Sequence, residues 1–516
     1  MAILRVVNII PQSMSGETAQ DSEPNLAVNP VNTKQIVATA FTPPPMGGSN
    51  APIFLSSNGG QTWSVRNVIP GAGATFPTRD ITVSFATAGG MLYAAILRGD
   101  DPARRMQILR SPALGLSGTA AMVVLSDRTG PDQPWVVTKT SGSSDRLWVG
   151  NNDLGAATQK TATVDSSANA RVASPTFGRT VVEARTTEGG DGPPVRLAAH
   201  SDGTVYAAFI RWAHTAPGGG TSTMPFINLD FDVVVTRDDK WGTGTNPFTA
   251  LTDPRDHVFG TRVADGLYTF WNATMGQERL GADLSIAVDP RNSATVWVAW
   301  GYKPGGVSGS IPWAIDVARS TDSGSNWAPV RRTIVRGKNP ALAVNSGGQL
   351  GFLYQQLTDT TNEWVTRLEV TSDAFDTAPE TYELHRAPSA TPARDFYPYL
   401  GDYVRLLSVK KNFYGIFSGS NEPDPAHFPN GVTYQRNVDW TTQRLLGVDG
   451  ASTVSSSIDP FFFSLVDDTF MPPPIIPRTG PISRTNIVPI RPPGPPSPII
   501  TRGPIEAPEP PTDLEL

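Results

Sequence analysis

One short unit recurs seven times along residues 1–470, and this repeat restricts the possible folds more than any other feature of the sequence. Six of the seven copies open with an acidic or amide residue. Every copy then has a short apolar strand, a tight turn and a second apolar strand. The openings recur every roughly 50–65 residues, a period typical of repeat folds, with one longer interval between the fourth and the fifth. They are Glu23, Asp80, Asp132, Pro194, Asp283, Asn339 and Asp402.

Strand pairs repeated at this period without helical patterning are typical of a β-propeller, in which each unit is one four-stranded blade. The 48 glycines and 48 prolines also favour many short strands joined by turns. The sequence therefore predicts an all-β protein with a seven-bladed β-propeller over residues 1–470, with six or eight blades as alternatives. The long interval between Pro194 and Asp283 leaves room for an eighth, degenerate blade, although we favour an insertion over roughly residues 215–281. Tyr268, Phe270 and Trp271 in that insertion are candidates for a lid or a plug.

The N-terminal segment ILRVVNII, residues 3–10, is an apolar run that precedes the first unit. Propellers usually close by pairing an N-terminal strand with the last blade, so we expect residues 3–10 to close the ring. The alternative is an ordinary edge strand.

Two segments follow a shared pattern with a serine, an Asp or Asn, a glycine and a tryptophan: LSSNGGQTW at 55–63 and RSTDSGSNW at 319–327. An Asp or Asn side chain can accept hydrogen bonds from the backbone of its own turn, and glycine tolerates positive φ. We expect a structural role for these residues, which are Asn58, Gly60, Trp63, Asp322, Gly324 and Trp327. Weaker copies are VTRDDKWG at 235–242, VTSDAFDT at 370–377 and YQRNVDWTT at 434–442.

Both segments resemble the Asp box of sialidase-like (BNR repeat) propellers, and EPNLAVNP, DQPW and LGDY resemble strand motifs of bacterial members of poorly defined activity. The resemblance covers about residues 20–468 and implies a propeller with a glycan-related role. True sialidases usually have six blades and an Arg-Ile-Pro motif, which this chain lacks. The resemblance also implies three arginines that bind a substrate carboxylate, for which the nearest candidates are Arg79, Arg196 and Arg394. The family also uses a tyrosine as its nucleophile, and the nearest candidates for that residue are Tyr397, Tyr399 and Tyr403.

Equivalent positions of propeller blades form a ring around the axis, so we expect the seven openings to converge on a central funnel. Five of them are carboxylates. The pattern nominates Asp80, Asp132, Asp283 and Asp402 as catalytic residues and Glu23, Arg79, Arg196 and Lys338 as substrate-binding residues. The resemblance adds Tyr403 to the catalytic set and Arg394 to the substrate-binding set. Carboxylates this close repel, so nearby cations, raised pKa values or a bound calcium ion must offset them. The alternative is that these groups cap turns at the strand starts.

Composition narrows the remaining classes of function. The net charge of −6 disfavours nucleic-acid binding, and the lack of cysteine excludes disulfides and thiolate-ligated zinc. No apolar run is long enough to cross a membrane as a helix, and the N-terminus lacks the features of a secretory signal. No cofactor is required by these patterns. We expect an extracellular or assembly-associated protein, with a cytoplasmic location as the alternative.

The C-terminal segment, residues 472–516, contains 15 prolines, too many for a helix or a sheet interior. Branched apolar residues lie among the prolines, including Ile475, Ile487, Val488 and Ile499, which a pure spacer would not need. The sequence therefore predicts an extended tail that binds a protein partner or a neighbouring subunit.

Two functions remain open at this point. The first is a binding or structural module, recognising a glycan or a protein and docked to a larger assembly through its tail. The second is an exo-glycosidase of sialidase type that acts on terminal sugars.

Overall fold

The computed structural model describes residues 2–41, 50–70, 78–98, 104–112, 122–155, 159–188, 195–217, 226–270, 283–392 and 400–467. The chain divides into two units, Met1–Met471 and Pro472–Leu516. The second unit, and with it the predicted tail, lies outside the described residues.

Six antiparallel sheets each take four strands that are consecutive in the chain. The first three sheets consist of β2 Ser22–Val28, β3 Ile36–Phe41, β4 Asn50–Ser56 and β5 Ser64–Pro70; β6 Thr78–Phe85, β7 Met91–Arg98, β8 Arg105–Pro112 and β9 Val123–Thr129; and β10 Pro131–Ser141, β11 Ser144–Asp153, β12 Ala162–Ser167 and β13 Gly178–Val181. The next three consist of β14 Arg196–Ala199, β15 Val205–Pro217, β16 Phe226–Asp238 and β17 Thr261–Phe270; β18 Leu284–Asp289, β19 Asn292–Tyr302, β20 Ala314–Ser320 and β21 Arg332–Val335; and β22 Gly337–Val344, β23 Leu350–Leu357, β24 Glu363–Thr371 and β25 Glu380–Pro388.

The seventh sheet joins the two ends of this unit. Its order is β26-β27-β32-β1-β28, from β26 Arg405–Val409, β27 Asn412–Ser420, β32 Ile458–Asp467, β1 Ala2–Asn8 and β28 Thr433–Tyr434. The N-terminal strand β1 pairs antiparallel with β32 from Ala2↔Asp467 to Asn8↔Phe461. A small sheet of β29 Val438–Asp439, β30 Arg444–Leu446 and β31 Thr453–Val454 lies between β28 and β32 in the chain.

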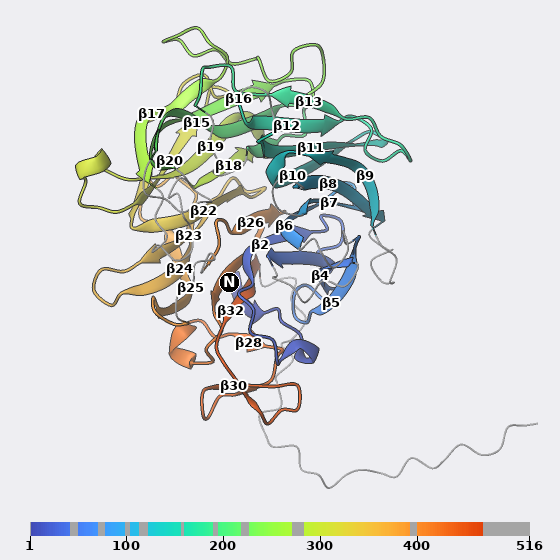
Figure 1. The fold of residues 1–516 in the computed structure, drawn as a ribbon, viewed down its shortest axis with the longest axis vertical. Helices are drawn as coiled ribbons and strands as arrows, with labels where there is room; N and C mark the ends of the chain where they lie inside the picture. The colour runs from blue at the N-terminus through green and yellow to red at the C-terminus, as the bar shows by residue number, and fades with distance from the viewer. Residues whose placement is uncertain are drawn as a thin grey trace, which may run out of the picture. The chain divides into compact units, whose positions relative to one another are not determined.

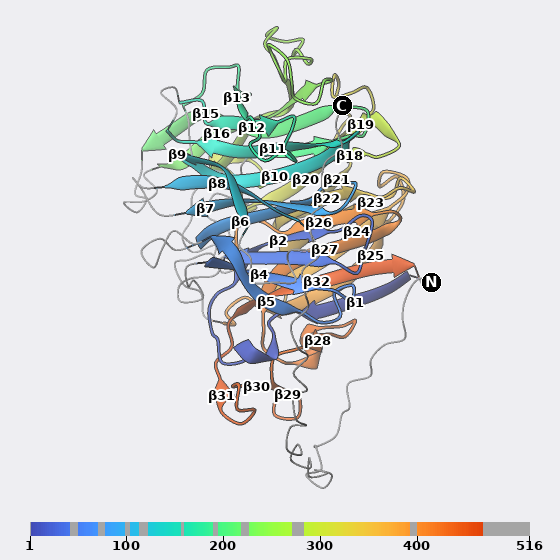
Figure 2. The same ribbon diagram turned by 90° about the vertical axis from the view of Figure 1, so that its right-hand side faces the viewer.

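The sheets form a closed ring. The first strand of each sheet contacts the first strand of the next, and β26 of the seventh sheet contacts β2 of the first. Figure 1 shows the sheets arranged around one axis, and Figure 2 shows them edge-on as a stack of tilted strands. The predicted all-β propeller is confirmed, and the described residues contain seven sheets of four or more strands, one for each repeat unit.

Both faces of the inner strands are buried, which explains why these strands read as nearly continuous apolar runs. Successive side chains of a strand point to opposite faces, and strand β7 shows the consequence. Leu92 and Ala94 pack with the first sheet, whereas Tyr93 and Ala95 pack with the third. Seven hydrophobic clusters of this kind fill the spaces between successive sheets in the described residues.

The long interval between the fourth and fifth repeat units belongs to the fourth sheet. Strands β15 and β16 have 13 residues each, and β17 completes the sheet before the fifth one begins. Tyr268, which we considered for a lid or plug, is a buried residue of β17. The side chain of Phe270 and all of Trp271 lie outside the described residues.

The Asp boxes form the turns after β4 and β20, which are the third strands of the first and fifth sheets. In the fifth sheet, Asp322 Oδ1 accepts hydrogen bonds from Ser320 Oγ at 2.8 Å and from Asn326 N at 2.9 Å. Asn58 of the first sheet accepts in the same way from Ser56 Oγ and Thr62 N, both at 3.0 Å. Each box therefore satisfies the polar groups of its own turn.

Two further turns share this geometry. Thr371 and Asp373 form it after β24, in the segment identified as a weak copy. Ser167 and Asn169 form it after β12, with Thr176 N as the donor. The sequence pattern missed this last copy because Thr176 follows its acceptor Asn169 by seven residues, whereas Thr62 follows its acceptor Asn58 by four.

Glycine in the first box is required by packing as well as by its φ of +84°. A Cβ atom on Gly60 would lie 2.1 Å from the Phe462 ring, which belongs to β32. The neighbouring Trp63 is 5% exposed and meets the Phe462 ring edge-on, with 5.3 Å between centroids. The box thus anchors the first sheet to the seventh. Among the described residues, no helix is both long and apolar enough to span a bilayer.

The tryptophans of the two boxes should contribute unequally to stability, because Trp63 is buried and Trp327 is only partly buried. We expect Trp63→Ala to lower the free energy of unfolding by about 3–5 kcal/mol, and Trp327→Ala to lower it less. Urea unfolding followed by fluorescence would measure both. Trp440→Ala, at a residue 38% exposed, serves as the control and should cost least. Equal losses in all three variants would contradict this role of Trp63.

Candidate functional site

The first strands of four sheets begin with a β-bulge on the side of the ring where the repeat units open. The strand registers shift between Ser22 and Asn25, Thr78 and Ile81, Asp132 and Trp135, and Lys338 and Ala341. A bulge adds an unpaired residue and redirects a side chain, and bulges are frequent beside active sites.

Three of the bulges hold a residue with positive φ directly before a proline: Glu23 at 53°, Gln133 at 48° and Asn339 at 54°. This conformation is unfavourable for residues other than glycine and costs about 1–3 kcal/mol for each. Side chains held in such strained positions gather at binding and catalytic sites.

The bulges also correct the ring of equivalent positions that the repeat suggested. Glu23 and Asn339 occupy the same position, as expected, but in the third sheet that position is Gln133 and not Asp132. In the second sheet, Asp80 is the second bulged residue, one place later. The extra residue in a bulge leaves no trace in the apolar pattern. Comparison of the repeat units by sequence therefore misplaced Asp80 and Asp132 by one position relative to Glu23 and Asn339.

Four carboxyl groups meet at the centre of the ring. Tyr403 Oη donates a hydrogen bond to Asp80 Oδ1 at 2.9 Å, and the Glu23 and Asp80 side chains share a hydrogen bond. The negative charge of Asp402 acts on both Asp80 and Asp283. We call Glu23, Asp80, Asp283 and Asp402 the carboxyl cluster. Its members are buried except for Asp402, which is partly exposed.

Burial makes these groups hard to ionise. The pKa of Asp80 is raised above its usual range, because burial and the charge of Asp402 outweigh the hydrogen bonds from Glu23 and Tyr403. Burial likewise raises the pKa of Asp283 to about 7, with Asp402 adding to the effect. The Asn339 N–H, which donates to Asp283 Oδ2 at 2.8 Å, opposes that rise. Asp283 can therefore hold or release a proton near neutral pH.

Two buried basic residues, Arg196 and Lys338, accompany the cluster. Arg196 is 4% exposed, and its charge favours ionisation of Asp283. Lys338 is 1% exposed, and burial lowers its pKa well below the usual range while Asp402 opposes that effect. The positive charge of Arg196 therefore offsets part of the negative charge that the cluster gathers.

Arg196 also packs on aromatic rings. Its guanidinium carbon lies 3.7 Å from the centroid of Trp135 and 5.4 Å from that of Tyr403, and the two rings meet edge-on at 5.5 Å. Sequence reasoning missed Arg405, whose guanidinium carbon lies 4.6 Å from the Trp135 centroid. The available signal was an arginine at the start of an inner strand, directly after Tyr403-Val404.

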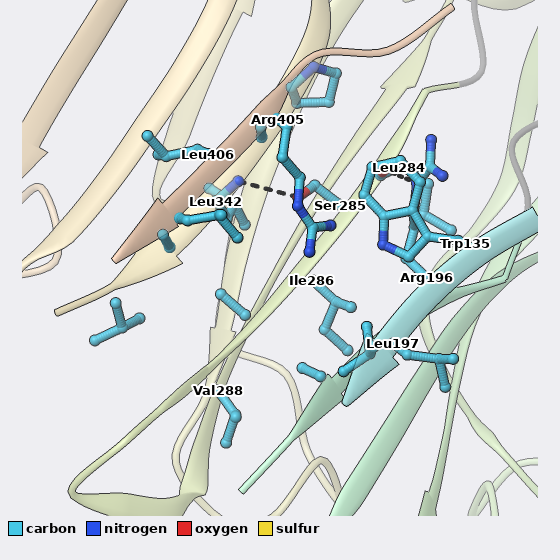
Figure 3. A pocket seen from close by; sticks show the side chains of 18 of the residues that line it. Trp135, Arg196, Leu197, Leu284, Ser285, Ile286, Val288, Leu342, Arg405 and Leu406 are labelled. Carbon is cyan, nitrogen blue, oxygen red and sulfur yellow. Dashed lines mark hydrogen bonds between the residues drawn. The ribbon is translucent and has the colours of Figure 1, made fainter. Parts of the chain in front are cut away.

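A cavity of about 210 Å³ extends from this aromatic layer along the first strands of the third to seventh sheets. Figure 3 shows Trp135, Arg196 and Arg405 at one end, with Leu284, Ile286 and Leu342 along the walls.

The remaining residues of the predicted site are placed as follows. Asp132 forms an ion pair with Arg104 and accepts a hydrogen bond from Gln133 N at 2.8 Å, so a local contact holds it. The side chain of Arg79 lies outside the described residues, and so do Pro194, Arg394, Tyr397 and Tyr399.

The described residues offer one group of three acidic side chains close enough to share a metal ion, and it lies away from the cluster. Glu17, Asp21 and Asp459 place one oxygen each within 4.8 Å of one another. Arg436 Nη1 already pairs with Asp459 Oδ2 at 2.8 Å and with Glu17 Oε1 at 3.2 Å. An arginine thus supplies the positive charge at this position. Calcium at the ring itself stays a prediction.

No protein-family model matches the sequence, and no curated protein matches it. Solved structures with a similar fold include an α-L-arabinofuranosidase from Fusarium graminearum bound to an iminosugar inhibitor, which is 12% identical with a TM-score of 0.39 over 88% of this chain and 97% of that one. An α-L-arabinanase from Penicillium chrysogenum bound to arabinobiose is 11% identical, with a TM-score of 0.41 over 89% and 98%. The Dos1 propeller is 9% identical, with a TM-score of 0.34 over 90% and 95%. Likeness at this level says nothing about what this chain binds.

Asp283 should make stability depend on pH. The pKa of Asp283 is about 7 in the folded protein and has its ordinary, lower value in the unfolded chain. Between these two values the folded protein keeps the proton, whereas the unfolded chain has lost it. The contribution of Asp283 to the free energy of unfolding should therefore fall between pH ~4 and ~7, by up to about 1.4 kcal/mol per pH unit. Asp283→Asn removes this dependence and retains an acceptor for Asn339 N. The measurement is the melting temperature of the variant minus that of wild type. This difference should increase with pH over that range and then become constant.

The matched control is Asp376→Asn at an exposed carboxylate. Its difference from wild type should not follow pH in this way. A pH-independent difference for Asp283→Asn would show that Asp283 ionises normally in the folded protein.

Proposed function

We propose that this chain is a glycoside hydrolase that acts on terminal sugars, with the carboxyl cluster as its active site. The observation that carries the proposal is a carboxyl group with a pKa of about 7, Asp283, beside the partly exposed Asp402 and a tyrosine hydrogen-bonded to Asp80. Glycosidases need one carboxylic acid that stays protonated near neutral pH and a second group that acts as nucleophile or base.

In this proposal Asp283 is the general acid, because it can be protonated at neutral pH and still release its proton to a leaving oxygen. Tyr403 is the nucleophile. Burial and the charge of Asp80 raise the pKa of Tyr403 well above its usual range, so its proton must pass to an adjacent base during attack. Asp80 accepts a hydrogen bond from the Tyr403 hydroxyl at 2.9 Å and shares another with Glu23, so in this proposal Asp80 takes that proton.

Arg196 and Lys338 are substrate-binding residues in this proposal, together with Arg79 and Arg394. The positive charge of Arg196 offsets part of the negative charge of the cluster. The Asp boxes support a place among sialidase-like propellers, since two of them close equivalent turns of the first and fifth sheets.

A second function, a non-catalytic binding module, is favoured by how completely the cluster is satisfied within the protein. Asp283 accepts from Asn339 N, Asp80 accepts from Tyr403, and both aspartates are buried. A buried polar network of this kind can hold the centre of the ring together without any reaction. In that case the protein binds a glycan or a protein, and residues 472–516 attach it to a larger assembly.

Hydrolysis separates these two functions. Wild-type protein should release fluorophore from at least one substrate in a panel of fluorogenic glycosides and sialosides. Asp283→Asn should lower kcat about 10²–10⁴-fold, the usual contribution of a positioned acid, and Tyr403→Phe should also abolish turnover. Asp376→Asn is the control and should retain full activity. Melting curves would verify that each variant is folded. Absence of turnover with every substrate, together with glycan binding measured on an array, would establish the binding module instead.

The tail is tested by its removal. Deleting residues 472–516 should leave the melting temperature of the propeller unchanged, because the seventh sheet is complete at Asp467. In pull-down and size-exclusion experiments, the full-length protein should associate with its partner, and the truncated protein should not. Unfolding of the truncated protein, or unchanged association, would contradict a partner-binding role for the tail.

A further inference from the structure

Asn339 contacts the segments that begin the fifth and the seventh sheets, although it belongs to the sixth. It lies in the bulge at the start of β22 and is fully buried. Its backbone N–H donates to Asp283 Oδ2 at 2.8 Å, and its side-chain Nδ2 donates to the Gly401 carbonyl at 3.2 Å. Gly401 is followed directly by Asp402 and Tyr403. One buried asparagine therefore joins the proposed acid to the segment of the proposed nucleophile.

The amide group of Asn339 also stabilises a strained backbone. Asn339 has a φ of 54° and precedes Pro340, whereas residues before proline favour an extended conformation with negative φ. Its Nδ2 donates to Gln355 Oε1 at 2.8 Å, and Gln355 Nε2 donates in turn to Thr366 Oγ1 at 3.1 Å and to the Ser418 carbonyl at 2.9 Å. These bonds stabilise the conformation that directs the N–H of Asn339 into the carboxyl cluster.

Gly401 is held from the opposite side by the first sheet. It has a φ of +90°, and a Cβ atom at this position would lie 2.4 Å from Glu23 N. Only glycine allows the backbone to approach so closely. Contacts with Glu23 and Asn339 thus fix the segment that carries Tyr403.

The N–H of Asn339 also acts on the charge state of Asp283. Burial raises the pKa of Asp283, and this hydrogen bond opposes the rise, because a donor to a carboxylate favours its ionised form. Two charged groups act on Asp283 as well: Asp402 raises its pKa, and Arg196 lowers it. Lys338, which precedes Asn339, acts on Asp402. Substitution of Asn339 leaves these three charged side chains in place.

We propose that Asn339 is a positioning residue that holds Asp283 and the Tyr403 segment at a fixed separation and keeps a backbone N–H directed at the Asp283 carboxyl group. Its part in catalysis rests on the proposed function, whereas its effect on the ionisation of Asp283 does not. Reacting groups must be closely aligned, and a displacement of about 1 Å can lower the rate about 10²-fold. Loss of Asn339 should therefore change both the ionisation of Asp283 and the rate of turnover.

Two variants test the effect on Asp283. Asn339→Ala removes the amide and disfavours positive φ, so the N–H should turn away from Asp283, whereas Asn339→Gly removes the same amide but tolerates positive φ. Each is compared with a double variant that also carries Asp283→Asn, and the melting temperature of the double variant minus that of the single variant is measured against pH. In the wild-type background this difference should become constant above a pH of about 7. In the Asn339→Ala background it should become constant about one pH unit higher, because Asp283 has lost the donor that favours its ionised form. Asn339→Gly should resemble wild type more closely.

The matched control is Asn345→Ala at the other end of β22. Asn345 is also buried, and its Nδ2 donates to Gln349 Oε1 and to the Lys411 carbonyl between β26 and β27, both at 2.9 Å. Its loss should lower stability without changing the ionisation of Asp283. Should Asn339→Ala not fold, Asn339→Ser takes its place, because it keeps a polar group in the buried site and still disfavours positive φ. An unchanged pH dependence in the Asn339→Ala or Asn339→Ser background would overturn the effect on Asp283.

Kinetics test the part that concerns catalysis. With a glycoside that wild type hydrolyses, Asn339→Ala and Asn339→Gly should lower kcat about 10²-fold with little change in KM, whereas Asn345→Ala should retain the wild-type kcat. Unchanged kcat in both Asn339 variants would overturn the positioning role. Absence of turnover in wild type contradicts the proposed function, and the melting experiments then decide by themselves whether Asn339 controls the ionisation of Asp283.

Discussion

The pairing of β1 with β32 is the contact on which the rest of this structure depends. It supplies the outer part of the seventh sheet from the opposite end of the chain and places Val7 and Ile9 in the cluster between the seventh and first sheets. Polar contacts reinforce the pairing. Asn8 Nδ2 donates to Asp459 Oδ2 at 2.7 Å, and the fully buried Arg436 pairs with the same carboxylate. Without this strand, β32 would lose its outer partner and the seventh sheet would end on an open edge.

Closure of the ring also creates the chemical problem at its centre. The first strands of all sheets run beside one axis, so the residues at their starts must share a small volume. Carboxyl groups brought together in this way become hard to ionise, and burial raises the pKa of Asp283 to about 7. The positive φ angles of Glu23 and Asn339 add backbone strain at the same positions. Packing of the seven sheets outside the centre provides the stability that maintains this unfavourable arrangement.

The aromatic layer of Trp135 and Tyr403 lies between two regions of opposite character. On the side of the strand starts, carboxyl groups predominate. On the cavity side, the charged groups are Arg196 and Arg405. Arg196 interacts electrostatically with Arg405 and with Asp283, so it connects the two regions.

The sequence determined those properties that depend on neighbouring residues in the chain. The repeat of paired apolar strands specified a propeller, because a sheet buried on both faces requires apolar residues at successive positions. The box residues around Asn58 and Asp322 specified their turns, because each carboxamide or carboxylate bonds to its own backbone. The acidic residues at the repeat openings led to the prediction that Asp80, Asp132, Asp283 and Asp402 converge near the axis. Only the tertiary structure decided the register, the partners and the charge states. Bulges set Asp132 one place from its expected position, where Arg104 pairs with it, and no apolar pattern records an extra unpaired residue. Arg405 and Trp135 belong to distant repeat units of the chain, so their contact and the cavity beside it exist only once the ring has closed.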